Sequence, residues 1–107
     1  MADASDRRAG ERMAVGGGTA CGFAGPVDEG LGPVRVRDVS MDGVGLIVSR
    51  PVAVGTLLAV TLTNAERKLS KTVLVRVAHA SAVPGGYLVG GTLAEPLTYQ
   101  ELTALVM

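Results

Sequence analysis

The sequence predicts a mainly β fold, in which five or six short strands form an antiparallel meander that closes into a small barrel, followed by one short C-terminal helix. Two observations support this prediction. Valines alternate with polar residues in short runs separated by turn residues, and no helical period appears between the runs. Closing such a sheet into a barrel hides the strand edges, which would otherwise be free to pair with other chains.

The length and composition favour one domain without a membrane-spanning segment. The chain has 107 residues, of which 48% are apolar, and this is enough for a single modest core. The longest apolar stretches are far shorter than the ~18–20 residues that span a bilayer. The N-terminus also lacks the apolar segment of a secretory signal, so we expect a soluble, cytoplasmic protein with no membrane insertion.

We expect a flexible, arginine-bearing arm over residues 1–12 and a single barrel domain over residues 13–107. The arm consists of polar and small residues, and Gly16-Gly17-Gly18 follows it as a flexible joint. The first predicted strand, residues 19–24, is made of small residues. The chain therefore places its N-terminal arginines on a segment that is joined only loosely to the domain.

The second predicted strand begins at Val34 and raises a question at its end. Val34 and Val36 share one face, and the arginines between and after them share the other. Asp38 follows on the valine face, where an unpaired carboxylate would cost several kcal/mol. Either the strand ends at this point or Asp38 has a cationic or N–H partner.

The remaining elements follow from the same alternation and from turn chemistry. Residues 40–43 form a turn that makes a hairpin of the second and third strands. At the C-terminus, Thr98 and Glu101 have the spacing of a capping box, and we expect the helix that follows to cover one end of the barrel. The later predicted strands are residues 44–49, 56–63, 71–80 and 87–93.

The residues that enzymes and metal sites need are scarce. His79 is the only histidine and Cys21 the only cysteine, so there is no second imidazole or thiol to form a metal set or a Cys/His pair with sensible spacing. His79 lies on the same predicted face as the strand valines, where a structural histidine is more common than a general base. We therefore expect no catalysis, no metal and no cofactor, and a Cys21 that is buried as a small apolar side chain.

Nucleic-acid binding is also disfavoured. Ten basic and ten acidic residues cancel, which leaves no overall attraction for DNA. Single-stranded RNA is bound by stacking bases on aromatic side chains, and the chain has only Phe23, Tyr87 and Tyr99. We expect neither DNA nor RNA as a partner.

Two short motifs carry complementary chemistry. Arg7, Arg8 and Arg12 form an RRxxxR motif, and Asp38, Ser40 and Gly43 form a DxSxxG motif about 26 residues further on. Guanidinium groups match phosphate oxygens and can stack on a base, whereas an aspartate accepts hydrogen bonds from the guanine edge. Taken singly, each motif has a simpler interpretation. The arginines can be an ordinary solvated tail, and the DxSxxG motif can be an ordinary turn with a positive φ at Gly43.

In this order and followed by strands, the two motifs resemble a PilZ domain, and residues 87–93 look like the last strand of that family. The resemblance implies a six-stranded antiparallel β-barrel that binds the bacterial second messenger cyclic di-GMP without catalysis. Arg8 and Arg12 would then hold the ligand's phosphates and guanine faces, and Asp38 and Ser40 would meet a guanine edge.

The resemblance extends to the remaining motif residues and to the signalling step. Gly43 would permit a close backbone turn, and Arg7 is similar to members that take up a stacked ligand dimer. Ligand would order the arm and so signal to an effector protein. Asp38 is expected to pair with an arm arginine before ligand arrives. The alternative is a PilZ-like protein-interaction module that binds no nucleotide, and the short C-terminal helix leaves a homodimer open.

Overall fold

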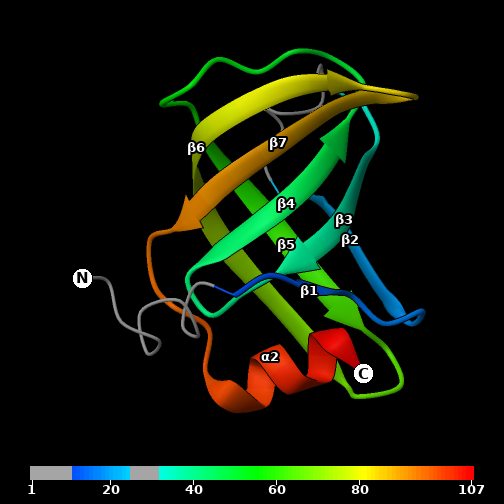
Figure 1. Cartoon of the computed structure of the whole chain (residues 1–107). Helices are drawn as coiled ribbons and strands as arrows, with labels where there is room; N and C mark the ends of the chain where they lie inside the picture. Colours follow the sequence, from blue (N-terminus) through cyan, green and yellow to red (C-terminus); the bar gives the residue numbers. More distant parts are fainter. Residues whose placement is uncertain (1–10, 25–31) are drawn as a thin grey trace.

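The computed structural model describes residues 11–24 and 32–107. Within them the chain is mainly β, with one short helix near the C-terminus, as the sequence predicts (Figure 1). In chain order the elements are β1 (Met13–Ala14), β2 (Thr19–Phe23), β3 (Val34–Val39), β4 (Gly43–Val48), β5 (Leu57–Asn64), β6 (Leu69–Val83), β7 (Gly86–Leu93) and α2 (Tyr99–Val106).

The strands form one antiparallel sheet, but their order is not that of a meander. The order is β1-β3-β4-β7-β6-β5-β2, so β4 pairs with β7 and not with β5. Residues 49–56 cross over the end of the molecule instead of turning back beside β4 (Figure 1). This crossover makes β4 to β7 a Greek-key arrangement, and the expectation of a simple meander was wrong here.

The sheet curls into a half-barrel. In Figure 1, β3, β4 and β7 form the near wall, β5 lies in the far wall, and the long strand β6 bends from one wall into the other. On the open side, the Cys21 thiol of β2 donates a 3.7 Å hydrogen bond to the Val34 carbonyl of β3. The seventh strand is β1, whose Met13 pairs with Val39 at the end of β3.

Valines and leucines from the two walls fill the interior. Buried and exposed residues alternate along β5 and the first half of β6, which is the pattern that predicted these strands. The largest fully buried side chains are Leu46, Leu58, Leu62, Leu97, Leu105, Val39, Val44, Val48, Val60, Val75, Val77 and Val89. The outer face of the near wall is thereby left free of core packing.

Helix α2 covers one end of the half-barrel, as predicted (Figure 1). Thr98 Oγ1 accepts a hydrogen bond from the Glu101 amide at 3.1 Å, and Glu101 Oε1 accepts one from the Thr98 amide at 2.8 Å. Lys71 of β6 contacts the same carboxylate at 2.9 and 3.0 Å, which ties the helix to the sheet. In the described parts of the chain, no helix has the length and apolar character needed to cross a membrane.

Candidate functional site

The predicted site residues that the structure describes gather on the outer face of the near wall, beside β1. In β4, Val44 and Leu46 face the core, so Gly43 and Gly45 lie on the outer face. Arg12 immediately precedes β1, which pairs with the end of β3. The N-terminal segment therefore reaches the strand that carries Asp38.

Asp38 is held by two arginines, one on each carboxylate oxygen. Arg12 Nη1 lies 3.0 Å from Oδ1, and Arg37 Nε lies 2.8 Å from Oδ2. Asp38 is buried, whereas both guanidinium groups are partly open to solvent. Of the two outcomes expected at Asp38, the structure shows the cationic partner, and Arg12 is the arm arginine that supplies it.

Two glycines of β4 leave room for this ion pair. A Cβ atom at Gly45 would lie 2.5 Å from Asp38 Oδ1, and one at Gly43 would lie 2.9 Å from Arg12 Nη2. Gly43 does not have the positive φ that an ordinary turn would suggest. The Arg12 guanidinium lies directly over it, so a side chain at this position would displace that group.

Ser40 lies inside the turn between β3 and β4. Its amide donates to the Gly43 carbonyl at 2.9 Å, and its hydroxyl donates to Asp42 Oδ1 at 3.1 Å. Only 1% of the residue is exposed. The geometry thus gives Ser40 the role of shaping the turn that follows Asp38.

Arg7 and Arg8 lie outside the described residues. Of the predicted set, the structure therefore brings together Arg12, Asp38, Ser40 and Gly43. Sequence reasoning did not assign Arg37 or Gly45 to the site. The signal for Gly45 was present, since a glycine within an apolar strand often marks the close approach of another group.

A β-bulge explains how Asp38, which the alternation predicts on the valine face, lies on the outer face of the sheet. Val36 pairs with Leu46, but Asp38 pairs with Gly45, so Arg37 is the extra residue of β3. The bulge shifts the alternation by one residue and moves Asp38 from the inner face to the outer face.

A second bulge lies in β6 at Ala78, between Val77, which pairs with Gly91, and His79, which pairs with Gly90. The expectation that His79 shares the valine face was therefore wrong. The bulge places this exposed imidazole on the outer face of the near wall.

Further cations surround the ion pair. Arg35 pairs across to Ile47 and Arg76 to Thr92, which places both arginines on the same outer face. Among the described residues, neither has a carboxylate within ion-pair distance. The near wall thus offers uncompensated positive charge around a single buried carboxylate.

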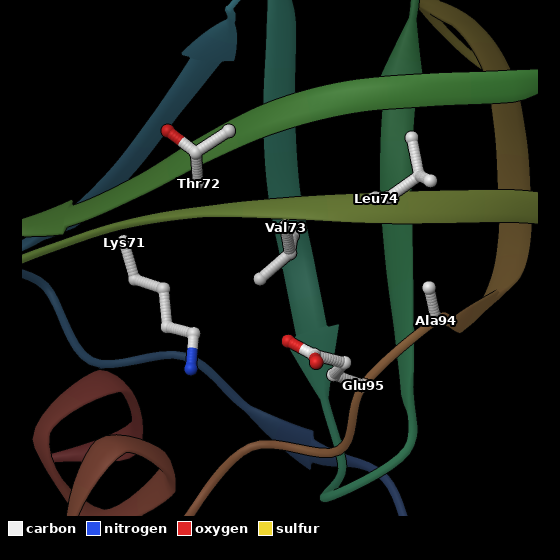
Figure 2. A pocket seen from close by; sticks show the side chains of 6 residues that line it. All are labelled: Lys71, Thr72, Val73, Leu74, Ala94 and Glu95. Atoms are coloured by element: carbon white, nitrogen blue, oxygen red, sulfur yellow. The ribbon is translucent and has the colours of Figure 1, made fainter.

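A hollow of about 350 Å³ lies elsewhere, between β6 and the segment that follows β7 (Figure 2). Lys71 reaches from β6 to the Glu101 carboxylate, so its charge is already compensated. Glu95, Leu74 and Ala94 complete much of the lining, and none of the predicted site residues takes part. Since the charge of Lys71 is compensated and Glu95 is acidic, the hollow does not have the composition of an anion site.

The described residues give no cluster of side chains that could hold a metal ion. Cys21 is half-buried, and burial raises the pKa of its thiol to about 11, so it stays protonated near neutral pH. Among known proteins, no family model and no curated sequence matches the chain.

Proposed function

We propose that the protein is a non-catalytic receptor for cyclic di-GMP, in which ligand orders the arm and thereby signals to an effector protein. One observation carries the proposal. Arg12 and Asp38, which belong to two motifs 26 residues apart, meet in an ion pair of 3.0 Å. As the receptor of an intracellular messenger, the protein would act in the cytoplasm.

The chemistry of the near wall supports an anionic, planar ligand. Cyclic di-GMP carries two phosphates, which guanidinium groups can bind. The near wall presents Arg35 and Arg76 on its outer face, and Arg12 lies beside them. Gly43 and Gly45 remove side chains from the floor beneath the ion pair. When Arg12 moves away from Gly43 as the ligand binds, a flat base can approach the backbone there closely while arginines contact the phosphates of the ligand.

A ligand that contacts Asp38 must share its carboxylate with two arginines or replace one of them. Each carboxylate oxygen can accept more than one hydrogen bond, so a guanine edge can add to the existing contacts or replace one of them. Arg37 lies next to Asp38 in β3, whereas Arg12 is the last residue of the arm as defined above. We therefore propose that Arg12 moves from Asp38 to a phosphate when ligand binds, while Arg37 stays.

The role of Ser40 is modified by its burial. A direct contact with a guanine edge requires an accessible hydroxyl, and the Ser40 hydroxyl is enclosed by its own turn. We assign it instead to holding the turn at Gly43 in the shape that keeps Asp38 in place. Arg7 and Arg8 remain in the proposal as phosphate-binding residues of the arm.

The protein-interaction module that binds no nucleotide is the second candidate, and one observation favours it. Asp38 already has both oxygens engaged by cations, as a purely structural ion-pair cluster would. In that case Arg12 would serve to attach the N-terminal segment to the barrel, and the outer face would meet a protein.

Calorimetric titration of Arg12→Ala and the parent chain with cyclic di-GMP separates the two candidates. The receptor model predicts micromolar or tighter binding by the parent and at least a tenfold weaker affinity for the variant. The variant should still fold, with a lower melting temperature, because Arg37 remains paired with the Asp38 carboxylate.

The matched control is Arg67→Ala, which removes an exposed arginine in the turn between β5 and β6, away from the ion pair. It should bind like the parent, and cyclic di-AMP and GTP should give no heat. A parent chain that shows no binding at ~100 µM ligand would instead support the interaction module.

A further inference from the structure

Four residues form one row across the outer face of the near wall. Asp38 of β3 pairs with Gly45 of β4, Gly45 pairs with Gly90 of β7, and Gly90 pairs with His79 of β6. Residues paired directly across antiparallel strands present their side chains on the same face. The row therefore consists of a carboxylate and an imidazole at its ends and two adjacent glycines between them.

Both end residues lean over the glycine next to them. A Cβ atom at Gly45 would collide with the Asp38 carboxylate, and one at Gly90 would collide with Nε2 of the His79 ring. The carboxylate and the imidazole thus lie over two adjacent glycines, whose Cα atoms are about 5 Å apart, and approach each other across them. Neither glycine can be replaced without moving the side chain above it.

A β-bulge precedes each of the two end residues of the row. Arg37 is the extra residue before Asp38, and Ala78 is the extra residue before His79. Without them, both ionisable side chains would fall on the inner face, opposite Val44 and Val89. Two separate bulges that aim two ionisable groups onto one pair of glycines indicate that His79 belongs to the same site as Asp38.

The charges around His79 are mostly positive. On its own strand, Arg76 is the neighbouring residue of the outer face, and β7 and β4 place no charged side chain in the adjoining positions. Across the row, β3 contributes Asp38, whose two oxygens are occupied by Arg12 and Arg37. Within the described parts of the chain, no hydrogen bond or ion pair holds the His79 ring.

We propose that His79 is a binding residue of this site and that its protonation makes the affinity for cyclic di-GMP depend on pH. The inference rests on the proposed function. Histidine changes its charge between about pH 5 and pH 8, unlike the arginines around it. An imidazolium adds a cation that a doubly anionic ligand can contact, so ligand favours the protonated ring and binding takes up a proton.

The test is a calorimetric titration of the full chain with cyclic di-GMP at about pH 7.2 and about pH 5.8, in buffers that differ in their heat of ionisation. The dissociation constant should fall roughly three- to tenfold at the lower pH. The buffer dependence of the heat should report an uptake of less than one proton per site. Because His79 is the only histidine, no other imidazole can give this signal.

Two variants make the assignment specific. His79→Gln cannot gain a proton, so its affinity should not change between the two pH values and its binding heat should not depend on the buffer. His79→Lys carries its charge at both pH values and should bind at least as tightly at about pH 7.2 as the parent does at about pH 5.8. Because residue 79 is exposed, both variants should fold, which circular dichroism can check.

The possible failures are distinguishable. A parent chain that binds cyclic di-GMP with equal affinity at both pH values and without proton uptake would overturn the role of His79 and leave the receptor function standing. A His79→Gln variant that keeps the pH dependence would do the same. Absence of binding at both pH values would overturn the receptor function, and this inference with it.

Discussion

At the scale of single residues, the site depends on the absence of side chains at Gly43 and Gly45 of β4 as much as on the charged groups above them. The ion pair of Arg12 and Asp38 occupies the space that side chains at positions 43 and 45 would fill. A glycine within a strand normally weakens it by roughly 0.5–1 kcal/mol. At Gly45 the absence of a side chain offsets this loss, because it leaves room for the buried Asp38 carboxylate beside its cationic partners.

We predict that Gly45→Ala weakens both the site and the fold. The added Cβ would lie 2.5 Å from Asp38 Oδ1, so the carboxylate must move away from Arg12 or Arg37. We expect a loss of about 1–3 kcal/mol in the free energy of unfolding, measured by urea denaturation. Under the receptor function proposed above, we also expect at least tenfold weaker binding of cyclic di-GMP.

Gly22→Ala is the matched control for this substitution. Gly22 also lies within a strand, β2, but a Cβ atom there would meet nothing within 4 Å. This variant should be as stable as the parent or more stable by up to about 1 kcal/mol. Equal losses in the two variants would show that the space at Gly45 is not reserved for the Asp38 carboxylate.

At the scale of elements, α2 is fixed at its N-terminus by one carboxylate. Glu101 accepts from the Thr98 amide and from Lys71, and these hydrogen bonds hold its pKa below the usual 4.5. Thr98 Oγ1 caps the Glu101 amide in return. A short helix with few turns depends on such end contacts, because its own hydrogen bonds are too few to stabilise it alone.

We predict that this contact makes the stability depend on pH on the acid side. A carboxyl whose pKa is lower in the folded state stabilises the fold above its unfolded pKa, and this contribution is lost as the pH falls through the folded pKa. The free energy of unfolding should therefore decrease below about pH 4.5, and it should decrease less steeply in Glu101→Gln. Urea denaturation at a series of pH values measures both slopes, and identical slopes would contradict the assignment.

At the scale of the whole molecule, the half-barrel and α2 share one core. Leu105 is completely buried, and its carbonyl accepts hydrogen bonds from the Gly16 amide at 2.9 Å and from the Thr19 hydroxyl at 2.7 Å. Asn64 of β5 donates to the Ala104 carbonyl at 3.0 Å. The last turn of the helix thus contacts the start of β2 and the end of β5, which are paired strands.

We predict that Leu105→Ala destabilises the whole domain and not the helix alone. Removing a buried leucine costs about 2–5 kcal/mol, because it leaves a cavity between α2 and the sheet. Circular dichroism should show a single transition at a lower temperature, as for one cooperative unit. Gln100→Ala, on the exposed side of α2, should leave the melting temperature nearly unchanged, and a separate early transition in Leu105→Ala would indicate an independently unfolding helix.

The sequence by itself determined the elements of this protein. Alternation of apolar and polar residues located β3, β5 and β6, an apolar run and turn residues located β4 and β7, and the spacing of Thr98 and Glu101 located α2. All of these signals arise from residues that are neighbours in the chain. The two motifs also indicated that Arg12 and Asp38 belong together. Burial of a carboxylate without a partner is costly, so the sequence alone required that Asp38 have one or lie outside the strand.

Only the tertiary structure decided how these elements meet. Three features depend on which strand lies opposite: the pairing of β4 with β7, the short strand β1 and the two bulges. The periodicity of one segment contains no information about its partner strand. The bulges moved Asp38 and His79 to the outer face, and the pairing placed Gly45 and Gly90 between them. The row of Asp38, Gly45, Gly90 and His79 combines residues from four strands, so it is a property of the folded sheet and not of any one strand.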